Sequence, residues 1–399
     1  MPEWHELGSR YLMNTIKRFP STMVRGQGVR LWDDKGREYL DFVGGWAVTC
    51  LGHAHPAYVS AITRQAQMLA QSSLHHYTVP QVQLAELLVK NSCLDRVFFT
   101  NSGAEAVEGA MKLARKYAKA NRNGAYEVIS ALNSFHGRTL AAVAATGQSR
   151  YQEPFLPMPD GFTNVPYNDI EAIKRATTAK TCAVLLEPIQ GEGGVNVPSE
   201  DYLRQVRRWC DEQGLVFILD EVQTGVGRTG TMFAYQQFGI EPDVMTLAKG
   251  LGGGFPIAAI LAKEKFSVFV PGDHGSTYGG NPLACAVGHA VVSYVLENDI
   301  PAHVRKVGKH FTSRLLDLKE RFPVISDVRG RGLLLALELN RDLGDDLQLA
   351  CLDRALIINR LKPNAIRFMP ALIITEAEVD KGMDIVRQAM EQVLAKQGK

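Results

Sequence analysis

The chain has 399 residues, 46% of them hydrophobic and 22% charged, and its 44 lysines and arginines nearly balance its 42 aspartates and glutamates. This composition indicates a soluble globular protein of two or three domains, and a formal charge of +2 gives no electrostatic reason to expect nucleic acid or a membrane as partner. The 36 glycines exceed the roughly 28 that an average usage of about 7% gives, so their positions matter.

The cysteines and the N-terminus indicate the compartment. Six scattered cysteines include no Cys-x-x-Cys pair and are too sparse for a disulfide scaffold, which favours a reducing environment. The first residues lack the apolar core of a signal peptide, and no run of about 18 apolar residues occurs. We therefore expect a cytoplasmic protein.

The first predicted element is a hairpin over residues 28–42. Apolar and polar residues alternate there around an Asp-Lys-Gly turn, a pattern typical of two paired strands. Downstream, helices alternate with short buried strands. The clearest helix is predicted over Ser102–Ala120, where apolar side chains share one face and basic side chains mostly lie on the other.

Five short apolar runs are predicted to be strands of one sheet. A parallel sheet that is buried on both faces requires continuous apolar runs separated by helix-length segments. The runs cover residues 96–100, 182–188, 215–221, 244–249 and 256–262. The middle of the chain is therefore predicted to be α/β with a largely parallel sheet.

The pattern shifts from about Asn281 onward to long amphipathic helices, with a predicted strand over 333–339 and a last helix over 376–394. This shift suggests a smaller α+β domain that packs with the N-terminal arm. The expected parts are the arm and hairpin at residues 1–50, a large domain at 51–285 and a small domain at 286–399.

Reactive side chains follow three of the predicted strands. Asp220 and Glu221 end one apolar run, Lys249 ends another, and Glu187 follows a third. Because ligands of open α/β sheets bind beyond the carboxyl ends of the strands, we expect these side chains at one edge. A buried lysine is costly unless it is paired, neutral or covalently used, so both a structural ion pair and a Schiff base with a carbonyl cofactor remain open.

The segment TNSGAEA at 100–106 is predicted to open a helix, because Ser102 and Glu105 have capping-box spacing. Its free N–H groups suit a phosphate, although a plain helix cap has the same pattern. The segment FHGRT at 135–139 combines an aromatic ring, an imidazole and Arg138, which suits a planar ring and a carboxylate.

Two further glycine-rich segments are less specific. Residues 225–230 match the dinucleotide fingerprint, but they lie beyond the strand and precede no clear helix, so a nicotinamide site is disfavoured. The loop 274–282 offers the hydroxyl groups of Ser276 and Thr277 ahead of a helix. No metal site is expected, because the paired histidines lack a third ligand at a characteristic spacing.

A phosphate-binding turn, a buried lysine, a buried aspartate and an aromatic ring together describe a site for pyridoxal 5'-phosphate. Lys249 would hold the cofactor aldehyde as an imine. Asp220 would keep the pyridine nitrogen protonated, so that the ring accepts the electrons left when a substrate C–H bond breaks.

The whole chain resembles the class III, fold-type I aminotransferases, and within them the members that act on N2-acetyl-L-ornithine. The resemblance implies their α/β fold, with a mostly parallel sheet in the large domain and a smaller α+β domain. The segments that carry it are GVRLWDDKGREYLDF, GHAHP, NSGAEA, FHGRT, LLEPIQGEGGV, LDEVQTGVGRTG, LAKGLGGGFPI, HGSTYGGNPLA, VRGRGLLL and IRFMPAL.

The resemblance also implies one pyridoxal phosphate per subunit, with Lys249 and Asp220 as the catalytic residues. In this family the active site lies between two subunits, so a homodimer is the minimal working unit. The implied cofactor-binding residues are Ser102, Gly103, Ala104, Phe135, Asp220, Glu221, Val222, Gln223, Lys249 and, from the neighbouring subunit, Thr277.

The substrate residues implied by the resemblance are two arginines and their neighbours. Arg138 would bind the carboxylate of the acyl-amino substrate, and Arg367 would bind the carboxylate next to the reacting carbon of glutamate. Glu192 would pair with Arg367 when an amine donor without such a carboxylate is bound. Ser276 belongs to the same substrate-binding set.

The implied reaction is a ping-pong transfer of the side-chain amine of N2-acetylornithine to 2-oxoglutarate, giving N-acetylglutamate 5-semialdehyde and glutamate, as in arginine biosynthesis. The chain departs from the acetylornithine-using members at Trp46, where they usually carry an aliphatic residue, and at Ser73, where they often carry asparagine. The open alternatives are another class III donor (ornithine, succinylornithine, acetyl-lysine, carrier-linked lysine or 4-aminobutyrate), a non-catalytic protein of the same fold, and an NAD-dependent oxidoreductase.

Overall fold

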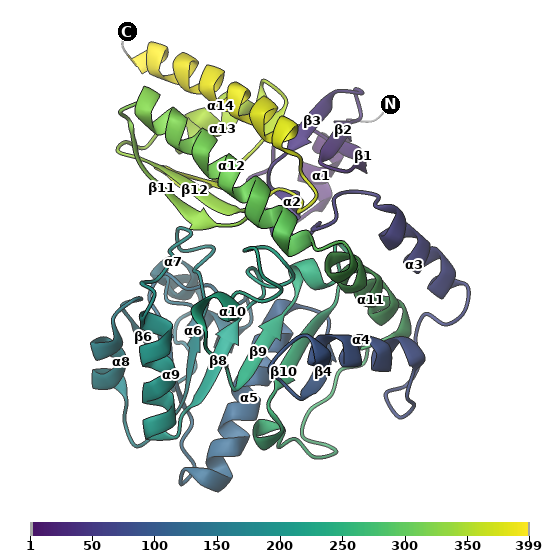
Figure 1. The fold of residues 1–399 in the computed structure, drawn as a ribbon, viewed down its shortest axis with the longest axis vertical. Helices are drawn as coiled ribbons and strands as arrows, with labels where there is room; N and C mark the ends of the chain where they lie inside the picture. The colour runs from purple at the N-terminus through teal and green to yellow at the C-terminus, as the bar shows by residue number, and fades with distance from the viewer. Residues whose placement is uncertain (1–2, 398–399) are drawn as a thin grey trace.

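The computed structural model describes residues 3–397 (Figure 1). A seven-stranded sheet forms the larger part of the molecule, in the lower half of Figure 1. Its strands lie in the order β4 (Arg96–Thr100), β10 (Ala258–Ala262), β9 (Val244–Leu247), β8 (Val216–Asp220), β7 (Thr181–Leu186), β5 (Glu127–Ala131) and β6 (Phe162–Val165).

Strand direction in this sheet confirms a largely parallel arrangement, with one exception. β10 runs antiparallel to both of its neighbours, and the remaining pairs are parallel. Residues 248–257, with one 3-10 turn, join β9 to β10, and an antiparallel pair needs no crossover helix. All strands except β10 therefore have their carboxyl ends at the same edge of the sheet.

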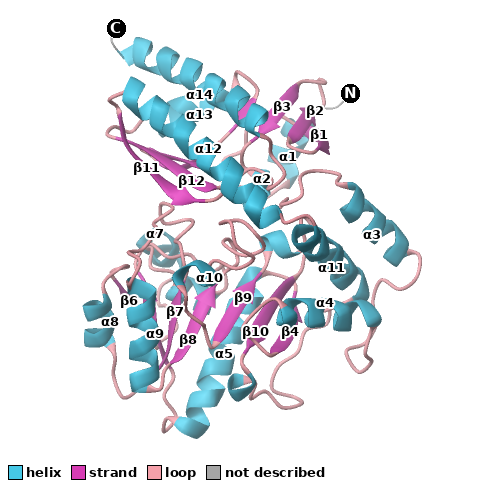
Figure 2. Ribbon diagram, in the orientation of Figure 1, coloured by secondary structure: helices cyan, strands magenta, loops and turns pink. Residues whose placement is uncertain are grey.

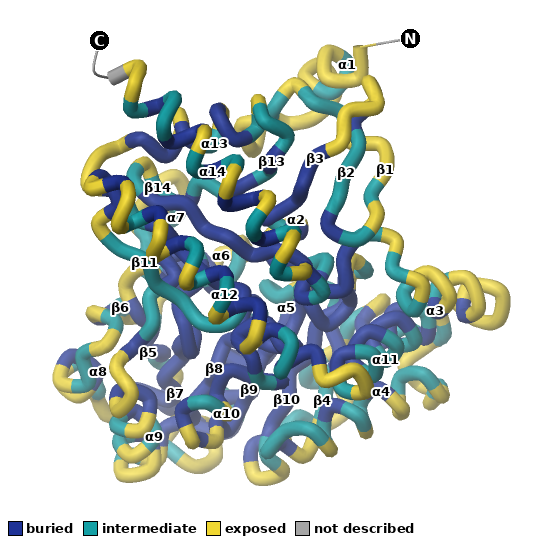
Figure 3. Tube along the Cα trace, turned by 45° about the horizontal axis from the view of Figure 1, so that its top comes forward, coloured by how far each residue is buried: buried dark blue, intermediate teal, exposed yellow. Residues whose placement is uncertain are grey.

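Helices cover both faces of the sheet, and the central strands are therefore buried along their whole length (Figures 2 and 3). The longest of them, α5 (Gly103–Asn121), begins directly after β4, which confirms the predicted helix and its Ser102–Glu105 capping box. The other helices in this part of the chain are α3 (Pro56–Ala66), α4 (Val79–Lys90), α6 (Leu140–Ala145), α7 (Ser149–Gln152), α8 (Ile170–Ala176), α9 (Tyr202–Gln213), α10 (Tyr235–Phe238) and the 3-10 turns at Glu153–Phe155, Lys249–Leu251 and Glu264–Phe266.

The C-terminal region forms a second, antiparallel sheet in the upper half of Figure 1. Long helices pack on it and on one another. Its strands lie in the order β11 (Ile325–Arg331), β12 (Leu334–Leu339), β15 (Ala365–Phe368) and β14 (Asn359–Lys362), and its helices are α12 (Ile300–Arg321), α13 (Gly344–Leu352) and α14 (Glu376–Gln397).

The N-terminal region pairs with the C-terminal one. After α1 (Trp4–Tyr11), the strands β1 (Met23–Gln27), β2 (Arg30–Asp33) and β3 (Glu38–Asp41) form a sheet in which β2 and β3 are the predicted hairpin. The short strand β13 (Leu356–Ile357) completes this sheet, parallel to β3. The expected boundary at 285/286 falls inside α11 (Pro282–Glu297), which packs on α3, α4 and α12.

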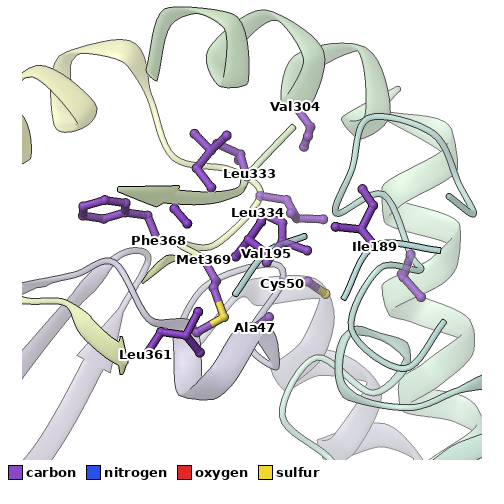
Figure 4. Packing of buried hydrophobic residues seen from close by; sticks show 14 of the residues in the cluster. Ala47, Cys50, Ile189, Val195, Val304, Leu333, Leu334, Leu361, Phe368 and Met369 are labelled. Atoms are coloured by element: carbon purple, nitrogen blue, oxygen red, sulfur yellow. The ribbon is translucent and has the colours of Figure 1, made fainter. Parts of the chain in front are cut away.

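The segment after β3 has an unusual backbone. In α2 (Gly44–Ala47) all four residues have φ between 56° and 64°, so the turn is left-handed, and two of them are not glycine. Side chains are rarely found in this conformation, which costs on the order of 1–3 kcal/mol per residue. Figure 4 shows the apolar cluster next to this turn, in which Ala47 and Cys50 lie together with Leu333, Leu334 and Met369 of the C-terminal region.

Within residues 3–397, no helix combines the length and the hydropathy needed to cross a bilayer.

Candidate active site

A cavity of about 420 Å³ lies beyond the carboxyl ends of the parallel strands, a volume typical of small-molecule sites. Glu187 after β7, Asp220 at the end of β8 and Lys249 after β9 all line it, so three of the four side chains predicted to meet at one edge do meet there, and Glu221 does not. The turn before α5 contributes Ser102, because β4 ends at this edge too.

Lys249 is half-buried in the cavity wall and has a left-handed backbone (φ 39°). Desolvation lowers the pKa of its ammonium group, and the positive charge of Arg367 lowers it further. The carboxylates of Glu192 and Asp220 raise this pKa, but the net shift is downward. Its amine is therefore neutral at a lower pH than that of an exposed lysine, which is the condition for attack on a carbonyl group. The strained backbone is typical of a functional site.

Asp220 is held by three hydrogen bonds. One carboxylate oxygen accepts from Val222 N at 3.0 Å and from Thr246 Oγ1 at 3.2 Å, and the other lies 2.8 Å from His136 Nδ1. The backbone of His136 in turn donates to Thr146 Oγ1, and its Nε2 is buried without a partner among the described residues. These contacts fix one carboxylate orientation, and both side chains line the cavity.

The N-terminus of α5 faces the cavity. Gly103 and Ala104 line it, and the first N–H groups of a helix have no acceptor within the helix. A Cβ at Gly103 would lie 3.0 Å from Val222 Cγ1, and one at Gly137 would lie 2.9 Å from Ala104 Cβ. The missing side chains let both backbones pack closely against their neighbours in the cavity wall, and the N–H groups at this helix N-terminus suit an anion such as phosphate.

Arg138 lies on the cavity wall with an exposed side chain. Its guanidinium carbon is 4.2 Å from the ring centroid of Tyr151 and 5.3 Å from that of Phe135. Within residues 3–397 no ion pair involves Arg138. The rings orient a cation whose charge is available to a ligand carboxylate.

Arg367 on β15 is fully buried and lies behind the cavity wall. Its Nη1 is 2.7 Å from Glu192 Oε1 and 3.0 Å from Gln223 Oε1, and Gln223 Nε2 donates to the same Glu192 oxygen at 3.2 Å. Burial raises the pKa of Glu192, but the charges of Arg367 and then Lys249 outweigh it and lower that pKa to about 2. Glu192 and Gln223 line the cavity and separate it from Arg367.

Besides Arg367, three expected site residues lie outside this cavity. Glu221 is buried with its carboxylate bonded to Thr224 Oγ1 and to the N–H groups of Ala234 and Tyr235, and burial raises its pKa to about 7. It shapes the loop after β8 and does not face a ligand in that cavity. Ser276 accepts from Asn101 Nδ2 at 3.1 Å, and Thr277 is exposed one residue further on.

The remaining sequence observations have local explanations. The dinucleotide-like segment 225–230 forms a series of turns, and no helix begins within it. Its Arg228 donates to the carbonyl groups of Leu333 and Pro370, so this loop is bonded to the C-terminal region. Trp46 is about half exposed and Ser73 bonds to His75, both outside the cavity of this single chain.

Several cavity-lining residues were not singled out from the sequence. These residues line the cavity because their loops return to the carboxyl edge of the sheet, which a sequence pattern does not reveal. The glycine-rich run after Lys249 was the only sequence feature that pointed to them. They are Val48, Asn101 and the segment Gly254, Phe255, Pro256 and Ile257.

Comparison with known proteins gives consistent matches along the chain. The family model for aminotransferase class-III matches residues 12–390. The acetylornithine aminotransferase of Caldanaerobacter subterraneus subsp. tengcongensis is 49% identical over 385 residues (96% of this chain and 98% of the relative), and that of Methanocaldococcus jannaschii is 45% identical over 393 residues (98% of both).

Solved structures agree with these relatives. An ornithine aminotransferase from Toxoplasma gondii, crystallised with partial occupancy of pyridoxal phosphate, has a TM-score of 0.95 and 31% identity over 99% of this chain and 96% of that one. The acetylornithine aminotransferase from Elizabethkingia anophelis has a TM-score of 0.87 and 34% identity over 98% of both chains.

Proposed function

The chain belongs to the class III aminotransferases, and from that membership we propose that it transfers the side-chain amine of N2-acetyl-L-ornithine to 2-oxoglutarate. The products are N-acetyl-L-glutamate 5-semialdehyde and L-glutamate. The observation that carries the choice of donor is Arg138, a cavity-wall guanidinium held by two rings and joined by no ion pair within the described residues. It suits the carboxylate of an acylated amino acid whose reacting amine lies at the other end.

The cofactor of this aminotransferase is pyridoxal 5'-phosphate. When bound, it supplies an aldehyde that condenses with amines and a ring that accepts the electron pair of a breaking C–H bond. The cavity fits such a group, because a half-buried amine, a fixed carboxylate and a helix N-terminus line it. Lys249 would bind the aldehyde, Asp220 would hold the pyridine nitrogen, and the turn Ser102–Ala104 would hold the phosphate.

Lys249 has a second proposed task. With its amine free, its Nζ would be a base in the cavity wall and would accept the proton that leaves the substrate carbon bearing the amine. Its lowered pKa matches this task, because a neutral amine is needed first. Glu192 neutralises Arg367 while acetylornithine is bound, and it swings aside when the carboxylate of 2-oxoglutarate or glutamate takes its place.

The donor is tested with the purified, pyridoxal-phosphate-loaded protein and 2-oxoglutarate as acceptor. Glutamate formation is measured with acetylornithine, ornithine, succinylornithine and 4-aminobutyrate. We expect the highest kcat/KM for acetylornithine. A clear preference for free ornithine or 4-aminobutyrate would refute this donor while leaving the aminotransferase itself intact.

Replacing Arg138 by alanine should raise KM for acetylornithine about 10- to 100-fold, because a charge-assisted hydrogen bond contributes roughly 1.5–3 kcal/mol. Initial rates at saturating 2-oxoglutarate give this value. Arg150→Ala is the matched control, since Arg150 lies over the same Tyr151 ring but does not line the cavity. Equal KM values for the two variants would remove Arg138 from the donor site.

We further propose that the working unit is a homodimer. Apolar side chains are exposed together on α4 and the loop before it, with Tyr77 95% exposed and Val82 50%. Gln71 Nε2 donates to the carbonyl group of Thr277, so this surface continues into the loop expected to reach a neighbouring subunit. Such an apolar patch is typical of an interface.

Tyr77→Asp combined with Val82→Asp should convert the dimer to monomers and lower activity, because two carboxylates would be buried without partners. Sedimentation measures the change in mass. Leu316→Asp is the control. Leu316 is about as exposed as Val82, but it belongs to α12 and not to α4 or the loop before it. A wild-type protein that sediments as a monomer at assay concentration would contradict the proposal.

A further inference from the structure

Among the residues that the structure describes, the buried guanidinium of Arg367 has three side-chain partners, and one of them carries a charge. Glu192 is the single carboxylate, at 2.7 Å from Nη1. Gln223 Oε1 accepts from Nη1 at 3.0 Å, and Asn359 Oδ1 accepts from Nε at 3.0 Å. Nη2 is buried with no partner among residues 3–397. The cation therefore has one charged partner and two neutral amides.

The charged partner is the one that is able to leave. Glu192 lines the cavity, its side chain is 18% exposed, and it lies between Gly191 and Gly193. Asn359 is attached differently, because antiparallel β14 pairs it directly with Arg367 of β15. Directly opposed residues of two strands project to the same face, so this contact is fixed by the register of the sheet.

The two amides also differ from each other. Gln223 donates to Glu192 as well as accepting from Arg367, so its position changes whenever Glu192 moves. Within the described part of the chain, the Asn359 side chain bonds to Arg367 and otherwise donates only to the Arg360 carbonyl group, at 3.5 Å. Asn359 is therefore the partner that stays on Arg367 in both positions of Glu192.

We propose that Asn359 is the positioning residue that keeps Arg367 aimed at the substrate carboxylate without neutralising its charge. This inference rests on the proposed function, in which the carboxylate of 2-oxoglutarate or glutamate replaces Glu192. A carboxylate at position 359 would satisfy Arg367 permanently, whereas an amide fixes the planar guanidinium and leaves its charge for the substrate. The choice of an amide therefore sets the affinity for the keto acid and not for the amine donor.

The experiment uses the pyridoxal-phosphate-loaded enzyme and the variants Asn359→Asp and Asn359→Ala. For Asn359→Asp we expect KM for 2-oxoglutarate to rise about tenfold or more, the size of one lost charge-assisted bond, with KM for the amine donor unchanged. Calorimetric titration with glutarate, a dicarboxylate that does not react, should show the same loss of affinity. Asn359→Ala removes the acceptor but adds no charge, so its loss should be smaller.

Asn364→Asp is the matched control, because Asn364 lies in the turn of the same hairpin and bonds to the Leu339 carbonyl group at 3.1 Å. It should leave glutarate affinity and both KM values unchanged. If Asn359→Asp binds glutarate as the wild type does, or raises both KM values equally, the inference is wrong. If wild type and Arg367→Ala bind glutarate equally well, the proposed role of Arg367 itself fails, which is a separate result.

Discussion

Replacing Lys249 by alanine should abolish turnover, with a loss of kcat on the order of 10⁴-fold or more. The reason is that one amine has two tasks in the proposed mechanism, binding of the aldehyde and transfer of the proton, and no second lysine lines the cavity among the described residues. Glutamate formation measures the rate. The visible absorption of the loaded protein measures attachment of pyridoxal phosphate, and the band that depends on the lysine should disappear.

The control is Lys263→Ala. Lys263 follows β10, whose carboxyl end lies at the opposite edge of the sheet, and it pairs with Glu241 at 3.0 Å. This variant should keep both the rate and the absorption band. A Lys249→Ala protein that retained near wild-type turnover would contradict the mechanism, because no other described residue is available to bind the aldehyde.

The second large effect is expected at Asp220. Exchange for asparagine should lower kcat about 10²- to 10³-fold while leaving pyridoxal phosphate bound, because removing the charged partner of a buried cation costs roughly 3–5 kcal/mol. The carboxylate is held by Val222, Thr246 and His136, so an amide of the same shape keeps the packing but loses the negative charge. Single-turnover rates with excess acetylornithine measure the chemical step.

The control is Asp243→Asn, which also removes a buried carboxylate. It shows whether the loss of kcat in Asp220→Asn comes from the missing charge in the cavity or from the loss of any buried carboxylate. Asp243 is as buried as Asp220, but it pairs with Arg207 and accepts from Phe217 N outside the cavity. Its exchange should lower Tm without changing the single-turnover rate. If Asp220→Asn instead lost the cofactor and kept its rate when saturated, the proposed partnership with the pyridine nitrogen would be wrong.

The sheet and the main catalytic edge were predictable because both depend on local patterns. The apolar runs that end in Asp220 and Lys249 are strands, and the capping box at Ser102 begins a helix where its spacing predicts one. β5 and β6 were missed, since EVISA and FTNV mix polar and apolar residues in segments of four or five. The reversed direction of β10 was also missed, because an apolar run carries no information about orientation.

Contacts that depend on strand register were beyond sequence reasoning. Asn359 meets Arg367 only because β14 and β15 pair in one particular register, and a shift of one residue would turn it to the other face. Similarly, Glu221 follows Asp220 directly, yet it turns away from the cavity because three donors of the next loop bind its carboxylate. Neighbours in sequence at a strand end therefore do not share a function by default.

The antiparallel direction of β10 affects how the cavity changes when related chains diverge. A parallel successor to β9 would require the chain to cross to the far edge of the sheet and return through a helix. Instead the chain turns back at the catalytic edge, so Lys249 and the wall segment Gly254–Ile257 belong to one loop. An insertion or deletion in that loop would displace the reactive amine and the wall together. The shape of the cavity and the position of its nucleophile therefore change as one unit during divergence of such chains.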